Sequence, residues 1–336
     1  MAARSLLKPL LGALAAQVFL ITLAFPVWSA GSPQCPTGTI RAEEVASLPP
    51  ECGLEGLTVT DHGVGAAVPE PGAGVRAEAW TEAGLQELEI RTDRDGEVRL
   101  LHVGDDTVVA PAGVRAAEAR LRGQPCKTCP HPCRDGANKI YGYVWPTGEI
   151  FEWFFNQQST PPNLTVEQAE TALINGTNNV VNARNGCKLA DNLDIQASYE
   201  GDTNAKANFG NDSSCDSFAK RDEVNVVDFS VLLNAAGKTC AWYLLDSQGN
   251  PGALVESDVR ILRWTNWTVQ PKRKLGCNDM FDLEGMATHE RAHTFGLGHV
   301  GRKHGNLTMS TFGLPECSAA YRTFGLGDVR GLEKLY

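Results

Sequence analysis

Three histidines lie close together in residues 289–299, at a spacing that suits a metal ion. His289 and His293 are four residues apart, slightly more than one helical turn, so a helix projects both imidazoles from one face. His299 follows after Gly296, and glycine readily adopts the positive φ that ends a helix. These histidines are therefore candidate metal ligands, and a set of three leaves the fourth tetrahedral position of a zinc ion open, as in catalytic sites.

Glu290 follows the first histidine and is placed to act beside the metal as a general base. Metal-activated water gives its proton to a neighbouring carboxylate as it attacks an amide carbonyl. The HExxH pattern arises by chance in about one per cent of such chains, and the added glycine and histidine lower this to roughly one in tens of thousands. The alternative, a structural helix with histidines along one side, leaves Gly296 and His299 unexplained. The motif therefore predicts metal-assisted hydrolysis of amide bonds.

The flanking sequence predicts the elements that position these side chains. Asp282 is a candidate N-cap, and apolar residues at helical spacing predict a helix over residues 283–295. Met309 follows His299 by ten residues, within residues 305–310, where it is expected to form a turn beneath the metal.

The motif HExxHxxGxxH followed by a methionine turn resembles the metzincin clan of zinc metallopeptidases. Residues 326–336 are similar to the last helix of matrixins, one branch of that clan. From Cys133 onward the chain resembles secreted matrixin-like proteases of actinobacteria, and the stretches that match best are residues 257–260, 296–299 and 305–310.

This resemblance implies an α+β catalytic domain with a twisted mixed sheet, an active-site helix, a methionine turn and a C-terminal helix. It implies a catalytic zinc ion and the roles of its neighbours: ligands His289, His293 and His299, general base Glu290, and turn methionine Met309. It also implies that the strand at residues 257–262 borders the cleft and pairs with an extended protein or peptide substrate.

The chain divides into four predicted parts. Residues 1–30 carry basic residues and then an apolar run that is short for a membrane anchor, which indicates a secretory signal peptide and an extracellular protein. Residues 31–125 are expected to form a small β-rich domain, with a hairpin turn at residues 95–96. By its position this domain is either an inhibitory propeptide, which we favour, or a retained binding module. A cysteine-rich junction at 126–135 precedes the metalloprotease domain at 136–336.

Ten cysteines in a chain expected to be exported indicate disulfides. Six of them lie in the protease-like region and predict three bridges there: Cys133, Cys187, Cys215, Cys240, Cys277 and Cys317. For the junction, disulfides are favoured over two alternatives. One is a zinc knuckle, and the other is a cysteine switch, in which a propeptide thiolate occupies the open position of the metal.

Elsewhere the chain alternates between helical and strand patterns. A capping box at Thr165 and Gln168 starts a predicted helix that ends near residue 185, and strands are predicted at 150–155, 224–229 and 239–244. Residues 191–222 are rich in Asp, Asn and Gly. Their oxygen atoms suit a structural calcium ion, with ordinary polar loops as the alternative.

The net charge of −10 argues against nucleic acid and against stable membrane association, because both attract basic surfaces. The expected partner is a protein or peptide substrate. Two alternatives to an endopeptidase remain open. One is a zinc-bearing cell-surface binding protein without turnover, and the other is an amidase of cell-wall peptide. Substrate preference and oligomeric state do not follow from the sequence.

Overall fold

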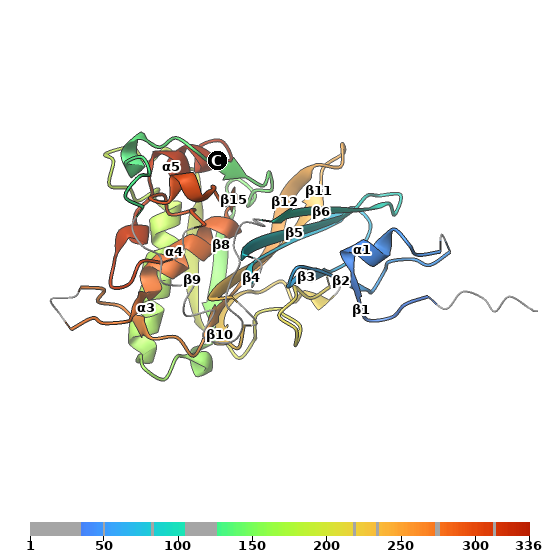
Figure 1. The fold of residues 1–336 in the computed structure, drawn as a ribbon, viewed down its shortest axis with the longest axis horizontal. Helices are drawn as coiled ribbons and strands as arrows, with labels where there is room; N and C mark the ends of the chain where they lie inside the picture. Colours follow the sequence, from blue (N-terminus) through green and yellow to red (C-terminus); the bar gives the residue numbers. More distant parts are fainter. Residues whose placement is uncertain are drawn as a thin grey trace, which may run out of the picture. The chain divides into compact units, whose positions relative to one another are not determined.

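The computed structural model describes residues 35–49, 51–81, 84–104, 126–217, 220–232, 235–272, 276–311 and 314–336. The predicted signal peptide lies outside them. Within these residues the chain has mixed α+β structure built on an eight-stranded mixed sheet (Figure 1). This confirms the predicted α+β class.

The strands of the large sheet lie in the order β6-β5-β4-β11-β12-β10-β8-β9. Their bounds are β4 (Ala73–Thr81), β5 (Gly84–Thr92), β6 (Val98–Gly104), β8 (Ile150–Phe155), β9 (Gln196–Asp202), β10 (Asn225–Ser230), β11 (Gly237–Leu245) and β12 (Pro251–Leu262). Strands β8, β9, β10 and β12 are parallel to one another, whereas β11 runs antiparallel to β12. The predicted strands at 150–155, 224–229 and 239–244 are confirmed.

Two helices cover one face of this sheet, α3 (Val166–Val181) and α4 (Leu283–Thr294) (Figure 1). The capping box at Thr165 and Gln168 starts α3 as predicted, but the helix ends before Asn182 instead of near residue 185. The helices approach closely because a Cβ on Gly176 would lie 2.4 Å from the Cβ of Ala287. The shared apolar core holds α4 firmly against the sheet.

Smaller elements complete the fold. Strands β1 (Thr39–Arg41), β2 (Thr58–Asp61) and β3 (Val64–Ala67) form a small sheet, with helix α1 (Ala42–Val45) beside it. Two-stranded pairs join β7 (Lys139–Ile140) to β15 (Leu297–Gly298) and β13 (Trp267–Thr268) to β14 (Phe281–Asp282). Helix α5 (Leu326–Leu332) lies in the segment predicted as the last helix.

Strands β4 to β6, from the predicted N-terminal domain, continue the same sheet as the rest of the chain. Strand β4 pairs antiparallel with β11, from Cys240↔Ala77 to Leu244↔Ala73. The hairpin predicted at residues 95–96 is present between β5 and β6, with Gly96 at φ 87°. A second apolar core joins β1 to β5 with β10 and β11, so residues 35–104 share both sheet and core with the remainder.

The predicted cleft strand is wrong in one respect. Residues 257–262 belong to β12, which lies inside the sheet between β10 and β11 and has no free edge. The part of the sheet contributed by residues 126–336 begins at β11, which pairs with β4, and ends at β9. The analogy failed because the sequence pattern of a strand does not reveal its neighbours in the sheet.

Five disulfides pair all ten cysteines. The three bridges predicted in the protease-like region are Cys133–Cys187, Cys215–Cys240 and Cys277–Cys317. The other two are Cys35–Cys52 and Cys126–Cys129. The disulfide interpretation of the junction is confirmed, and neither a zinc knuckle nor a cysteine switch is compatible with these pairings.

A buried carboxylate on β12 anchors the loop before β10. Glu256 accepts hydrogen bonds from the Asn208 amide at 2.8 Å and from the backbone N–H of Glu223 at 2.6 Å. Burial raises the pKa of Glu256 to about 7, and these hydrogen bonds oppose the rise only in part. Ionised Glu256 is therefore costly in the folded state.

This raised pKa predicts a pH-dependent stability. The contribution of Glu256 is fully present below its unfolded pKa near 4.5 and is lost as the pH rises through about 7. The loss amounts to at most about 3 kcal/mol. We expect urea unfolding to show that Glu256→Gln gains stability relative to wild type between pH 5 and pH 8. For the control, exposed Glu152→Gln, the free energy of unfolding should change with pH in parallel with that of wild type. An equal pH dependence for all three proteins would contradict the raised pKa of Glu256.

Candidate metal centre

The three predicted histidines converge in the structure. His289 and His293 project from one face of α4, with their Nε2 atoms 3.2 Å apart. Gly296, at φ 86°, then turns the chain, and a Cβ there would lie 2.7 Å from the carbonyl oxygen of Tyr143. Pairing of β15 with β7 directs the chain back, so that the Nε2 atom of His299 lies 2.8 Å from that of His289 and 3.2 Å from that of His293.

The opposite ring nitrogen of each histidine has its own partner. Nδ1 of His289 lies 2.8 Å from the carbonyl oxygen of Thr308, and Nδ1 of His293 lies 2.7 Å from that of Leu297. A carbonyl only accepts, so both Nδ1 atoms donate and both Nε2 atoms carry lone pairs. Lone pairs directed at one another in a buried site repel unless a cation lies between them. The arrangement fits a metal ion held through Nε2, with the outer partners orienting the rings.

Burial also favours the neutral imidazole of His289. It lowers the pKa of His289 well below its ordinary value, and the neighbouring His293 and His299 lower it further. The neutral imidazole is the form that binds a metal. Among the described residues, this trio is one of two groups of His, Cys, Asp or Glu side chains close enough to hold a metal ion. The other group includes Glu78, which sequence analysis did not identify.

A turn around Met309 supports the first histidine. Asp328 of α5 accepts hydrogen bonds from the backbone N–H groups of Thr308 at 3.0 Å and Met309 at 3.3 Å. These hydrogen bonds hold the backbone of Thr308, whose carbonyl oxygen contacts Nδ1 of His289. Met309 itself is buried in the core beneath α4. Burial raises the pKa of Asp328 to about 6, although the backbone hydrogen bonds oppose this.

Glu290 lies on the same helix and contacts β11. Its Oε2 accepts a hydrogen bond from the Thr239 hydroxyl at 2.7 Å, and a Cβ on Gly237 would lie 2.3 Å from its Oε1. Burial raises the pKa of Glu290 well above its ordinary value, and the nearby charge of Glu78 adds to the rise. Thr239 and Gly237 thus position this carboxylate, and no motif in the sequence marks them.

Glu78, on β4, reaches the histidines from the N-terminal segment. Its Oε2 lies 3.2 Å from Nε2 of His293 and 3.4 Å from Nδ1 of His299. The side chain is buried, and this oxygen has no hydrogen-bond partner within the described residues. Glu78, Glu290 and His293 form the second group able to hold a metal ion. The site therefore contains two carboxylates where only one was predicted.

A buried ionic network surrounds Glu78. On β5, Glu87 contacts Nδ1 of His299 at 3.3 Å and accepts from Arg76 at 2.6 Å. Glu87 also accepts from Lys139 and from the hydroxyl of Tyr141. Positive charges around Glu87 and its contact with His299 hold its pKa well below its usual range against the effect of burial. The outer partner of the third histidine is thus a carboxylate from the N-terminal segment.

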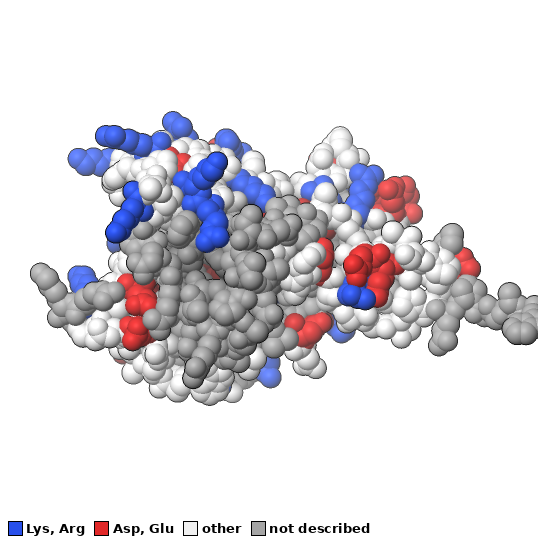
Figure 2. Space-filling view, in the orientation of Figure 1, with Lys and Arg blue, Asp and Glu red and all other residues white. Residues whose placement is uncertain are grey.

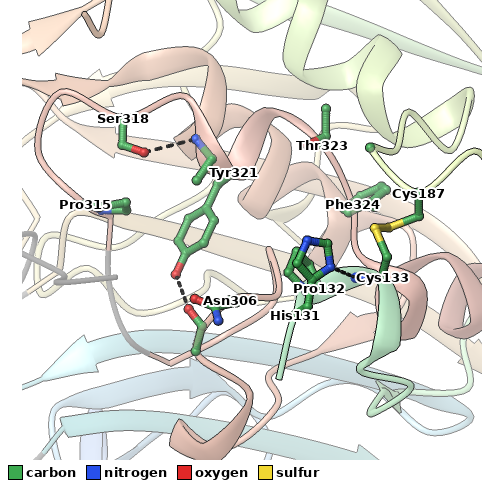
Figure 3. Close-up of a pocket in the computed structure, with 13 residues that line it drawn as sticks. His131, Pro132, Cys133, Cys187, Asn306, Pro315, Ser318, Tyr321, Thr323 and Phe324 are labelled. Carbon is green, nitrogen blue, oxygen red and sulfur yellow. Dashed lines mark hydrogen bonds between the residues drawn. A yellow bond between two sulfur atoms is a disulfide. The ribbon is translucent and has the colours of Figure 1, made fainter. Parts of the chain in front are cut away.

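A separate pocket of about 380 Å³ lies between the cysteine-rich junction and the segment around α5 (Figure 3). Tyr321 crosses it and donates to the carbonyl oxygen of Gly305, while the Cys133–Cys187 disulfide closes one side. None of the five residues in the two candidate metal-binding groups lines this pocket. On the face drawn in Figure 2, Lys and Arg side chains gather over the end of the molecule that contains α5.

No protein-family model matches the chain, and a comparison with curated proteins finds no match. The resemblance to metzincins therefore stays a prediction based on motif residues. Within the described residues, no helix is long and apolar enough to cross a membrane. In the described part of residues 191–222, no three His, Cys, Asp or Glu side chains gather closely enough to hold an ion, so the calcium site stays a prediction.

The converging nitrogens predict stoichiometric metal binding. We expect the folded chain to bind one zinc ion, and His299→Ala to weaken its affinity roughly 100-fold or more, because outer-partner changes alone cost 10- to 100-fold. Zinc should also raise the melting temperature of wild type far more than that of the variant. The exposed His62→Ala is the control. Equal zinc affinity in His299→Ala and wild type would remove His299 from the ligand set.

Proposed function

We propose that this chain is a secreted, zinc-dependent endopeptidase of the metzincin type. The observation that carries the proposal is the meeting of three Nε2 atoms, all within 3.2 Å of one another, while the two helix histidines donate through Nδ1 to carbonyls. A three-imidazole donor set suits zinc among the common divalent ions, and it leaves room for a further ligand. Five disulfides support an oxidising, extracellular environment.

When bound, zinc supplies a Lewis acid that lowers the pKa of water and polarises the scissile carbonyl. The protein's own part falls to Glu290. Its carboxylate accepts the proton from the attacking water and then passes it to the leaving amine, so one side chain serves as base and acid in turn. The Thr239 hydroxyl fixes Oε2 of this carboxylate, and Gly237 leaves space for Oε1.

The position of β11 supports an extended peptide as substrate. The strand runs past Glu290 through Gly237 and Thr239, and the edge that faces away from β12 carries regularly spaced backbone donors and acceptors, which pair with β4 in this structure. A peptide that pairs with such an edge gains backbone hydrogen bonds whatever its side chains. This arrangement brings a main-chain amide beside Glu290, as an endopeptidase requires.

The role of Glu290 is tested by Glu290→Gln. We expect this variant to retain its zinc and to lose casein cleavage by about three orders of magnitude or more, because the amide cannot accept the proton. Zinc content and turnover are measured with and without a chelator, on the chain as isolated and after limited proteolysis. Peptidoglycan is assayed in parallel.

The outcomes separate the alternatives. Chelator-sensitive turnover of peptidoglycan but not casein would favour a cell-wall amidase. No turnover of either substrate in any zinc-loaded form would favour the binding protein. Near-normal casein cleavage by Glu290→Gln would refute the general-base role.

Gly237 provides an independent test of the carboxylate's position. A methyl group at this residue displaces the Glu290 carboxylate, so we expect Gly237→Ala to lower kcat about 10- to 100-fold with unchanged zinc content. Gly53→Ala is the matched control, because nothing lies within 4 Å of its added Cβ. Unchanged kcat in Gly237→Ala would show that the carboxylate tolerates displacement.

A further inference from the structure

We infer that β4 is a built-in inhibitory strand. Glu78 would be a further ligand of a metal held by the histidines, while the backbone of β4 covers the edge of β11. This inference rests on the proposed function, because it places β4 where the substrate would bind. It assigns the regulation of the site to a carboxylate rather than to a thiol.

The backbone of β4 already makes the pairing that a peptide substrate needs. Five registered pairs join it antiparallel to β11, and the last of them, Cys240↔Ala77, lies directly beside Thr239 and Glu78. Thr239 in turn contacts Glu290. The strand therefore passes over the centre of the site, and a peptide cannot reach the same edge until β4 leaves it.

Strand alternation directs the charged side chains of β4 towards the histidines. Val75 and Ala77 point into the apolar core shared with β1 to β3. Arg76 and Glu78 point to the other face, where Arg76 stacks on the ring of Tyr141 at 3.4 Å and Glu78 meets His293. Both charged side chains are buried. A one-residue shift in register would withdraw Glu78, so the β4–β11 pairing fixes its position.

The local charge balance calls for a cation beside Glu78. In the hairpin register Glu78 lies opposite Glu87, and like charges at such a position destabilise a sheet. Arg76 and Lys139 neutralise Glu87, whereas Oε2 of Glu78 has no hydrogen-bond partner in the described structure. Buried charges require a partner. A divalent ion held at the three Nε2 atoms would provide one, because Oε2 of Glu78 lies 3.2 Å from Nε2 of His293.

Side chains from both parts of the chain hold this strand in place. Arg76 pairs with Glu89 at 2.7 Å as well as with Glu87, and Glu89 also bonds to the hydroxyl of Tyr243 on β11. Lys139 contributes from β7. Since all ten cysteines are in disulfides, no thiol is left for the regulatory role. Glu78 is the side chain that the structure offers for it.

The test uses the full chain loaded with cobalt(II), whose visible absorption reports the ligand set. We expect Glu78→Ala to change the spectrum, as water replaces the carboxylate. The variant should also bind acetohydroxamate at least about 10-fold more tightly than wild type, because no protein ligand must be displaced. Glu78→Gln has nearly the same shape and is included in case Glu78→Ala does not fold. It should change the cobalt spectrum and the affinity for acetohydroxamate in the same direction. Glu97→Gln, in the exposed β5–β6 turn, is the matched control.

Identical spectra and hydroxamate affinities in wild type, Glu78→Ala and Glu78→Gln would overturn the inference. Failure of the proposed function gives a different result, because wild type would then bind no cobalt or would bind it independently of the three histidines. Casein cleavage by the zinc-loaded proteins is a second readout. We expect Glu78→Ala to raise it only in part, since β4 still covers the sheet edge.

Discussion

The site depends on an electrostatic constraint: three buried imidazoles direct their Nε2 atoms at one point, an arrangement that a cation between them would stabilise. Each supporting element restricts the orientation of an imidazole ring. Helix α4 sets two rings one turn apart, the Gly296 turn and the β7–β15 pair return the third, and Asp328 holds the turn at Met309. Because these supports come from opposite ends of residues 126–336, the ring arrangement depends on the folded core and not on the local sequence alone.

Features encoded by local spacing were predictable from the sequence. The ligand spacing, the positive φ of Gly296, the Asp282 cap and the start of α3 at Thr165 depend on residues only a few positions apart. Three disulfides in the protease-like region followed from the even number of cysteines in that region. The helix and turn features have causes that act within a few residues. The disulfides follow from an oxidising compartment, so neither prediction needed knowledge of long-range packing.

Features set by strand order were not predictable. The patterns of β11 and β12 both indicate strands, but only the folded sheet shows that β11 lies between β12 and the N-terminal strand β4. Thr239 and Gly237 gain their roles from that placement. In β4 and β5, charged residues alternate with apolar ones, which indicates a solvent-exposed face. That face can be buried because ion pairs balance its negative charges: Arg76 pairs with Glu87 and Glu89 on the neighbouring strand, and Lys139 of β7 pairs with Glu87.

The contact between Glu87 and His299 spans 212 residues of sequence. Synthesis from the amino terminus therefore delivers the acidic hairpin well before the histidine helix emerges. A chain made without this early segment would leave His299 without its carboxylate partner, so the third ring would lose the contact that orients its Nδ1 side.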